Sequence, residues 1–138
     1  MKNYIGFKLV QAEPMEKEGK AGYKVVYADG YESWSPADVF EKAYMELGGN
    51  PELPSKVSIS QENVDNFIKE VYTDTIGEKT TLVRAVLVNG FEIVEASSCV
   101  DAANYSQEIG EEVCLERIKN KIWELLGFLL QTAVGGVK

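Results

Sequence analysis

The stretch SQEIGEEVCLERIKNKIWELLGFLLQTAV, residues 106–134, predicts one long helix that changes character halfway. As far as about Lys121 the helix is amphipathic, because apolar residues recur at helical spacing among charged ones. From Ile122 to Leu130 it is apolar on almost every side. A helix that is apolar all round must be covered all round, so this segment governs how the rest of the chain is arranged.

The apolar segment Ile122–Leu130 also predicts self-association. It is too short to span a bilayer, which requires about 20 apolar residues. A chain of 138 residues has limited means of covering such a segment alone, because small domains leave much of their surface exposed. We therefore expect a homodimer that associates through this helix, with any binding site between the subunits.

Two further elements are predicted before the long helix. Thr80–Glu95 contains two runs rich in strand formers, and Asn89-Gly90 between them is a turn of hairpin type. The first run is apolar on both faces, so we expect it to be covered on both. Upstream, Ser60 is placed to cap a helix whose apolar residues follow helical spacing as far as Tyr72.

The N-terminal third predicts a separate small module. Tyr4–Gln11 is rich in strand formers, Asp29-Gly30 is a tight-turn signal between aromatic-rich strands, and Ser35-Pro36 is typical of a helix start. Gly48–Lys56, with its glycines and prolines, reads as a linker. We expect an α+β fold: an antiparallel β-sheet with hairpins packed against helices, and a long C-terminal helix in an oligomer interface. Its domains are a β-hairpin/helix module at 1–47 and an α+β core at 57–138.

Charge and cysteine content exclude several classes of partner. The net charge is −8, with 14 Lys and Arg scattered among 22 acids, whereas a nucleic-acid binder needs a basic face to neutralise phosphates. We therefore expect no DNA or RNA partner. No signal peptide or transmembrane segment is evident, so no membrane partner is expected either. Cys99 and Cys114 have no metal-type spacing and give no disulfide framework, which suits a reducing cytosol.

The sequence contains no histidine. This removes Ser-His and Cys-His nucleophiles, imidazole metal sites and histidine general bases together. No phosphate-binding loop, dinucleotide fingerprint or zinc-protease motif is present among the remaining residues. We therefore expect a binding protein rather than an enzyme, with no catalytic residue, no metal ligand and no cofactor.

Three groups of residues are candidates for a binding site, and Arg84 is the first. It is the only charge in a strand that is otherwise apolar on both faces. A buried guanidinium needs an anionic partner. That partner is either one of the many glutamates, in an internal salt bridge, or a ligand phosphate.

The second group combines amides, a carboxylate and aromatic rings, namely Asn89, Phe91, Asp101, Asn104 and Tyr105. One interpretation is structural, with turn chemistry for Asn89 and helix capping for Asp101 or Asn104. The other is that Phe91 or Tyr105 stacks on a base while the amides bind its edge.

The third group is Arg117 with Lys121, four residues apart on one face of the long helix. Arg117 has no acidic residue at helical spacing, and Lys121 can reach Glu124 but also lies beside Arg117. Two neighbouring cations suit an anion supplied from outside. A solvated face, or pairing with another part of the fold, is the alternative.

Several of these residues belong to motifs that resemble known phage proteins. The stretch from about Val57 to Thr132 resembles a family of small tailed-phage proteins in Asn89-Gly90-Phe91, Asp101, Asn104-Tyr105, Glu108-Ile109-Gly110 and Lys121-Ile122-Trp123-Glu124-Leu125-Leu126-Gly127. The N-terminal third is similar to a module of phage anti-defence proteins in Tyr4-Ile5-Gly6-Phe7-Lys8, Asp29-Gly30-Tyr31-Glu32-Ser33-Trp34-Ser35-Pro36 and Val39-Phe40-Glu41-Lys42-Ala43-Tyr44. In this order and at this length, the two halves together resemble the first family of Thoeris anti-defence proteins.

This resemblance implies a nucleotide sponge that acts in the cytoplasm of the infected bacterial host. Members of the family bind cyclic ADP-ribose isomers made by TIR-domain enzymes and sequester them without cleavage. Members are homodimers that can assemble further into hexamers, and some also bind cyclic oligonucleotides at a separate site. The family fold is α+β, with pockets at the subunit interface.

The chain has the side chains that such a ligand requires. Phosphates call for arginine or lysine, ribose hydroxyls for amides and carboxylates, and adenine for an aromatic platform. We expect Arg117 and Lys121 to bind the phosphates and Phe91 to stack on the base, close to the start of the long helix and to the second hairpin. Two alternatives stay open: a phage regulatory protein that inhibits a host protein through an acidic surface, and an enzyme that cleaves the signal.

Overall fold

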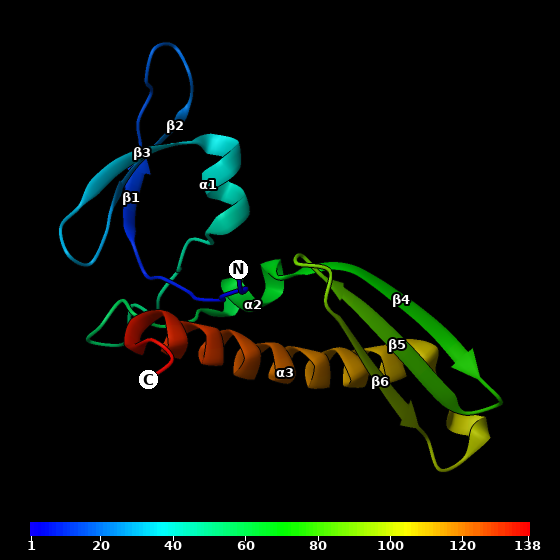
Figure 1. The fold of residues 1–138 in the computed structure, drawn as a ribbon. Coiled ribbons are helices and arrows are strands. Elements are labelled where there is room, and N and C mark those ends of the chain that lie inside the picture. The colour runs from blue at the N-terminus through cyan, green and yellow to red at the C-terminus, as the bar shows by residue number, and fades with distance from the viewer. The chain divides into compact units, whose positions relative to one another are not determined.

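The computed structural model describes residues 1–138 and has the α+β fold expected from the sequence. Two antiparallel three-stranded sheets, with strand orders β1-β2-β3 and β4-β5-β6, are accompanied by helices (Figure 1). The chain divides into two compact units. The first comprises Met1–Leu47 and Phe128–Lys138, and the second comprises Gly48–Gly127.

The first unit is built on the predicted aromatic hairpin. Its elements are β1 (Gln11–Pro14), β2 (Gly22–Val26), β3 (Glu32–Pro36) and α1 (Ala37–Ala43). Gly30 has a φ of +88°, a left-handed conformation that glycine adopts without strain, so the Asp29-Gly30 turn is confirmed. The rings of Tyr23, Phe40 and Tyr44 stack in series, with centroids 4.3 and 4.8 Å apart. This aromatic stack packs α1 against the hairpin.

The strand expected at Tyr4–Gln11 is wrong, because β1 begins only at Gln11. A strand needs a hydrogen-bonded neighbour, and within the N-terminal segment only Gln11–Pro14 pairs with β2. The side chains of Tyr4 and Ile5 are accordingly exposed. These strand-forming residues have no partner strand and therefore adopt no regular secondary structure.

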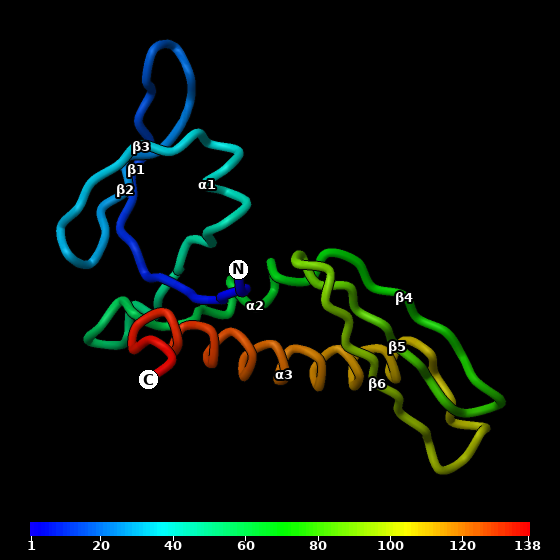
Figure 2. The backbone as a smooth tube through the Cα atoms, in the orientation of Figure 1, coloured from blue at the N-terminus to red at the C-terminus, as the bar shows by residue number.

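The second unit holds a β-meander, traced by the backbone in Figure 2. Its elements are α2 (Gln61–Asn66), β4 (Ile68–Ile76), β5 (Thr80–Leu87), β6 (Glu92–Ser98), the 3₁₀ helix η1 (Ala102–Asn104) and, as far as Gly127, the helix α3 (Gln107–Gly135). The long helix predicted from the sequence is confirmed as α3. The hairpin around Asn89-Gly90 is confirmed as β5–β6, and Gly90 has a φ of +88°.

The predicted helix after Ser60 is only partly right. Ser60 forms a capping box with Asn63, and Val64 is fully buried, so the helix start is confirmed. However, α2 ends at Asn66, and Ile68–Ile76 forms β4 instead of continuing the helix. The reason is pairing with β5 along the whole strand, which no local helical spacing reveals.

Strand β5 is covered on one face only, which corrects the expectation of two covered faces. Thr81, Val83, Ala85 and Leu87 are buried and alternate with more exposed residues. Helix α3 lies along the covered face (Figure 1) and buries Cys114, Ile118, Ile122 and Leu126, each four residues apart. The opposite face of the sheet, hereafter the outer face, has no element of this unit over it, so Leu82, Arg84 and Val86 are not buried.

Burial of the apolar segment of α3 is uneven. Ile122 and Leu126 lie in the core of the second unit, whereas Leu125 is exposed and Phe128 has 71% of its surface accessible. A single chain thus covers one side of the segment and leaves another side open. None of the helices combines the length and the apolar character needed to cross a bilayer.

Candidate functional site

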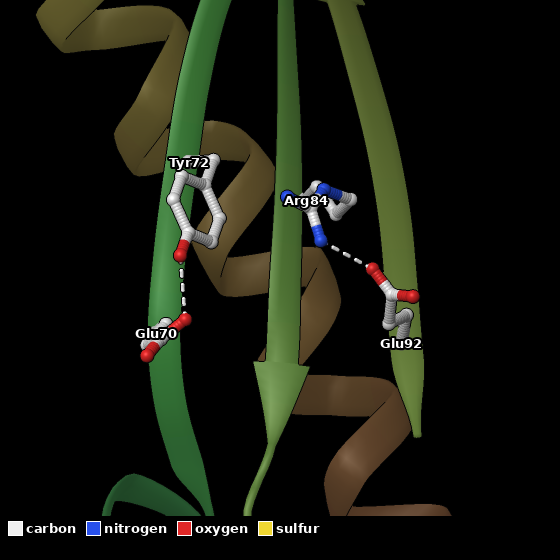
Figure 3. A network of polar contacts seen from close by, with 4 residues as sticks. All are labelled: Glu70, Tyr72, Arg84 and Glu92. Atoms are coloured by element: carbon white, nitrogen blue, oxygen red, sulfur yellow. Dashed lines mark hydrogen bonds and ion pairs between the residues drawn. The ribbon is translucent and has the colours of Figure 1, made fainter. Parts of the chain in front are cut away.

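Arg84 lies at the centre of a polar network on the outer face of the second sheet (Figure 3). Its guanidinium carbon is 4.4 Å from the ring centroid of Tyr72 on β4, and its Nη1 pairs with Glu92 Oε1 on β6. Tyr72 donates its hydroxyl hydrogen to Glu70 Oε2, and this hydrogen bond raises the pKa of Tyr72. The expectation that Arg84 is buried is wrong because the outer face is uncovered. Of the two partners left open for Arg84, a glutamate is present as a salt bridge at the surface.

Asn89 and Phe91 lie in the turn between β5 and β6. Asn89 Oδ1 accepts a hydrogen bond of 3.0 Å from the backbone N–H of Phe91, so the side-chain amide stabilises the turn. The ring of Phe91 is 56% exposed. It is therefore accessible to a planar ligand from solvent.

Asp101, Asn104 and Tyr105 surround η1, which follows β6. Asp101 caps η1 by accepting from the N–H of Ala103 at 2.9 Å, and Asn104 is the last residue of η1. The hydroxyl of Tyr105 is 2.7 Å from Thr75 Oγ1 and 2.9 Å from Thr81 Oγ1. Tyr105 therefore connects the segment around η1 to β4 and β5 through hydrogen bonds.

Arg117 and Lys121 both reach from α3 to β6. Arg117 donates from Nη1 to the carbonyl oxygen of Ala96 at 3.0 Å, and Lys121 Nζ pairs with Glu95 Oε1 at 2.7 Å. In the free chain both cations pair with another part of the fold, one of the alternatives left by the sequence, and their binding of an external anion stays a prediction. Both side chains remain largely exposed.

The eight candidate residues do not form a single cluster within one chain. Phe91 precedes the seven-residue strand β6 and Asp101 follows it, and a strand of that length spans roughly 20 Å. Arg117 and Lys121 lie beside the middle of β6, and Arg84 lies on the outer face. Phe91 was expected close to the start of the long helix. This is wrong, because α3 begins beside η1, at the other end of β6.

Other polar residues of the second unit were missed by the sequence reasoning. Tyr72 lies directly opposite Arg84 on β4, and Glu92 lies diagonally across on β6, where Val94 is the residue in register. Strand alternation around a lone arginine could have indicated both. Lys119 Nζ lies 2.9 Å from Asp65 Oδ1 on α2, and its hydrogen bond lowers the pKa of that carboxyl. A shallow polar cavity of about 460 Å³ lies where α2 meets α3, with Trp123 in its lining. No local signal pointed to it, since its walls come from separate elements.

Comparison with known proteins identifies the origin of the chain. It is a bacteriophage protein, because residues 59–134, more than half of its length, match the model of a phage family. The chain belongs to the phage protein (N4 Gp49/phage Sf6 gene 66) family. Comparison with the curated proteins and with the solved structures finds no match. The match spans the whole second sheet and nearly all of α3.

Proposed function

We propose that this phage protein is a non-enzymatic sponge. It binds TIR-derived cyclic ADP-ribose signals in the cytoplasm of the infected bacterial host and sequesters them without cleavage, which blocks Thoeris immunity. The observation that carries the proposal is that the family match at residues 59–134 contains all eight candidate ligand residues. The same stretch contains one of the two sets of motifs that resemble Thoeris anti-defence proteins, and the other set lies in the N-terminal third.

The chemistry of the accessible groups supports an anionic, base-containing ligand. A sponge competes by mass action, so it needs tight binding and no acid, base or nucleophile. Phe91 offers an exposed ring. Arg117 donates one hydrogen bond to the carbonyl oxygen of Ala96, and its other N–H groups can donate to a phosphate. Glu95 neutralises Lys121 in the free protein. A ligand phosphate would take the place of Glu95 as the partner of Lys121.

The separation of the candidate groups supports a site shared between two copies of the chain. One small ligand cannot contact both Phe91 and Tyr105 of the same chain across about 20 Å of strand. A second copy brings another set of the same residues. We therefore place the site in a homodimer, which can assemble further into hexamers, and cyclic oligonucleotides are candidate ligands for a second site.

We expect the homodimer to form through the uncovered side of α3, around Leu125 and Phe128. Phe128→Glu places a charge in that interface and is expected to give a monomer by light scattering at micromolar concentration. Ile109→Glu is the matched control, because Ile109 is exposed on the same helix outside the apolar segment, and it should remain dimeric. Leu126 is unsuitable for this test because it is buried within its own chain. A monomeric parent protein, or a dimeric Phe128→Glu variant, would contradict the proposal.

We expect Arg117→Ala and Phe91→Ala each to weaken the binding of cyclic ADP-ribose while leaving the fold intact. Loss of a charge-assisted hydrogen bond costs about 1.5–3 kcal/mol of binding free energy, and loss of a stacking ring about 1–3 kcal/mol. Isothermal titration calorimetry measures both effects. Arg84→Ala removes the only other arginine, a candidate ligand residue on the outer face, and measures whether that face takes part in binding. If Arg84→Ala loses binding and Arg117→Ala does not, the site is on the outer face.

Ligand recovery separates a sponge from an enzyme. The protein is incubated with the product of a TIR enzyme, purified and heat-denatured, and the released molecules are analysed by mass spectrometry. A sponge returns the intact cyclic nucleotide in stoichiometric amount. Loss of cyclic ADP-ribose at substoichiometric protein would mean that the chain is an enzyme.

One observation favours the second candidate function, inhibition of a host protein through an acidic surface. Glu70, Asp74 and Glu92 lie on the outer face around the exposed side chains of Tyr72 and Val94. Exposed apolar area with charged neighbours is typical of protein interfaces. A stoichiometric protein partner in a pull-down from the host, with no small molecule retained, would support this alternative over the sponge.

A further inference from the structure

The first unit contains a cavity that lies entirely outside the residues assigned to the sponge. Its volume is about 550 Å³, which is within the range of small-molecule sites. The lining residues are Phe7, Lys8, Leu9, Tyr27, Ala28, Asp29, Tyr31 and Ala133. Ala133 belongs to the C-terminal segment that is part of the same unit.

Three aromatic rings line this cavity, and two of them, Phe7 and Tyr31, are exposed. Tyr27 and Tyr31 are 5.8 Å apart and tilted by 30°, and 65% of Tyr31 is exposed. Phe7 is also exposed. The rings of Tyr23, Phe40 and Tyr44 in the same unit are closer together, with centroids 4.3 and 4.8 Å apart, and stack on one another. The rings of Phe7 and Tyr31 are therefore available to stack on a planar molecule.

The cavity also has one cationic and one anionic group. The ammonium of Lys8 lies 5.2 Å from the ring centroid of Tyr27 and forms no ion pair with a carboxylate. One carboxylate oxygen of Asp29 accepts the N–H of Tyr31 at 2.9 Å. Its second oxygen is left to accept a hydrogen bond from a ligand. A ligand that satisfies all three features is planar, anionic at one end and an N–H donor at the other.

We propose that this cavity binds a nucleotide whose base carries an amino group. The base stacks on Tyr31, its amino group donates to Asp29, and its phosphate pairs with Lys8. The proposal goes beyond the sponge function, because none of these residues lies within the family match at residues 59–134.

Adenosine monophosphate and adenosine are suitable probes for the full-length protein, with binding measured by ligand-observed NMR titration. Tyr31→Ala is expected to weaken the binding of adenosine monophosphate by about tenfold or more, whereas Tyr31→Phe keeps the ring and the binding. Lys8→Ala is expected to weaken the binding of adenosine monophosphate and to leave the binding of adenosine unchanged. Uridine monophosphate, whose base has no amino group, is expected to bind more weakly than adenosine monophosphate.

Two controls keep this proposal separate from the sponge function. Tyr4→Ala removes an exposed ring outside the cavity and should bind adenosine monophosphate like the parent. Tyr31→Ala, which changes none of the candidate residues of the sponge, should bind cyclic ADP-ribose like the parent. The proposal is overturned if adenosine monophosphate fails to bind at millimolar concentration, or if Tyr31→Ala binds it as well as the parent with its circular dichroism spectrum unchanged.

Discussion

Ile118→Ala is expected to lower the free energy of unfolding by about 2–5 kcal/mol, the usual cost of truncating a buried isoleucine. Ile118 is fully buried on the side of α3 that faces the second sheet, and Cys114 and Ile122 lie one turn away on either side. The truncated side chain leaves a cavity that these neighbours cannot fill, since packed interiors relax only partially. Urea denaturation followed by circular dichroism, at a fixed protein concentration, measures the loss.

Ile109→Ala is the matched control for this prediction. It makes the same chemical change on the same helix, but the side chain of Ile109 is 61% exposed. We expect the free energy of unfolding to change by no more than about 0.5 kcal/mol, as for most surface substitutions. Equal losses for the two variants would mean that α3 does not pack against the sheet through the face that contains Ile118.

Gly110→Ala is expected to destabilise the protein even though alanine favours helices more than glycine. A Cβ atom at residue 110 would lie 2.0 Å from Thr81 Oγ1 and 2.6 Å from Thr81 Cβ. Thr81 is fully buried and hydrogen-bonded to Tyr105, so it has no free space to enter. Overpacking of this kind costs about 1–3 kcal/mol. Thermal and urea unfolding of the variant measure the net effect.

Gly127→Ala on the same helix is expected to stabilise the protein, the opposite of the effect of Gly110→Ala. A Cβ atom at this position meets no atom within 4 Å. The substitution therefore gains helix propensity, worth about 0.5–1 kcal/mol, without a clash. If both variants are stabilised, α3 and β5 are farther apart at Gly110 than the structure places them.

The elements that sequence analysis predicted correctly are those specified by local chemistry. Asp29-Gly30 and Asn89-Gly90 form turns because glycine accepts positive φ angles. The capping box at Ser60 is specified within three residues. Helix α3 is long enough that the helical spacing of its apolar residues distinguishes it from a strand.

The elements that it missed depend on contacts between distant residues. Residues 68–72 continue a helical spacing, yet they form β4 because β5 pairs with them. Alternation in β5 could not show which of its faces α3 covers. Short apolar runs fit a helix and a strand equally well until a partner strand is known.

The candidate site was predictable as a set of chemical groups and not as a geometry. The sequence shows that Arg84, Arg117 and Lys121 are cations that need anions or acceptors. It does not show that Glu92, the Ala96 carbonyl and Glu95 satisfy them, since each lies on a strand brought into place by tertiary pairing. Whether such groups converge depends on three-dimensional distances, which spacing along the chain does not determine.

The composition of the two units has a consequence for the order in which they are completed during synthesis. The second unit is a single continuous segment, Gly48–Gly127, so all of its residues have been translated before the first unit has received its own last segment, Phe128–Lys138. A nascent chain generally folds its N-terminal part first. Here, the more N-terminal unit is the last to have its full set of residues, and until then its β-hairpins depend on contacts within Met1–Leu47 alone.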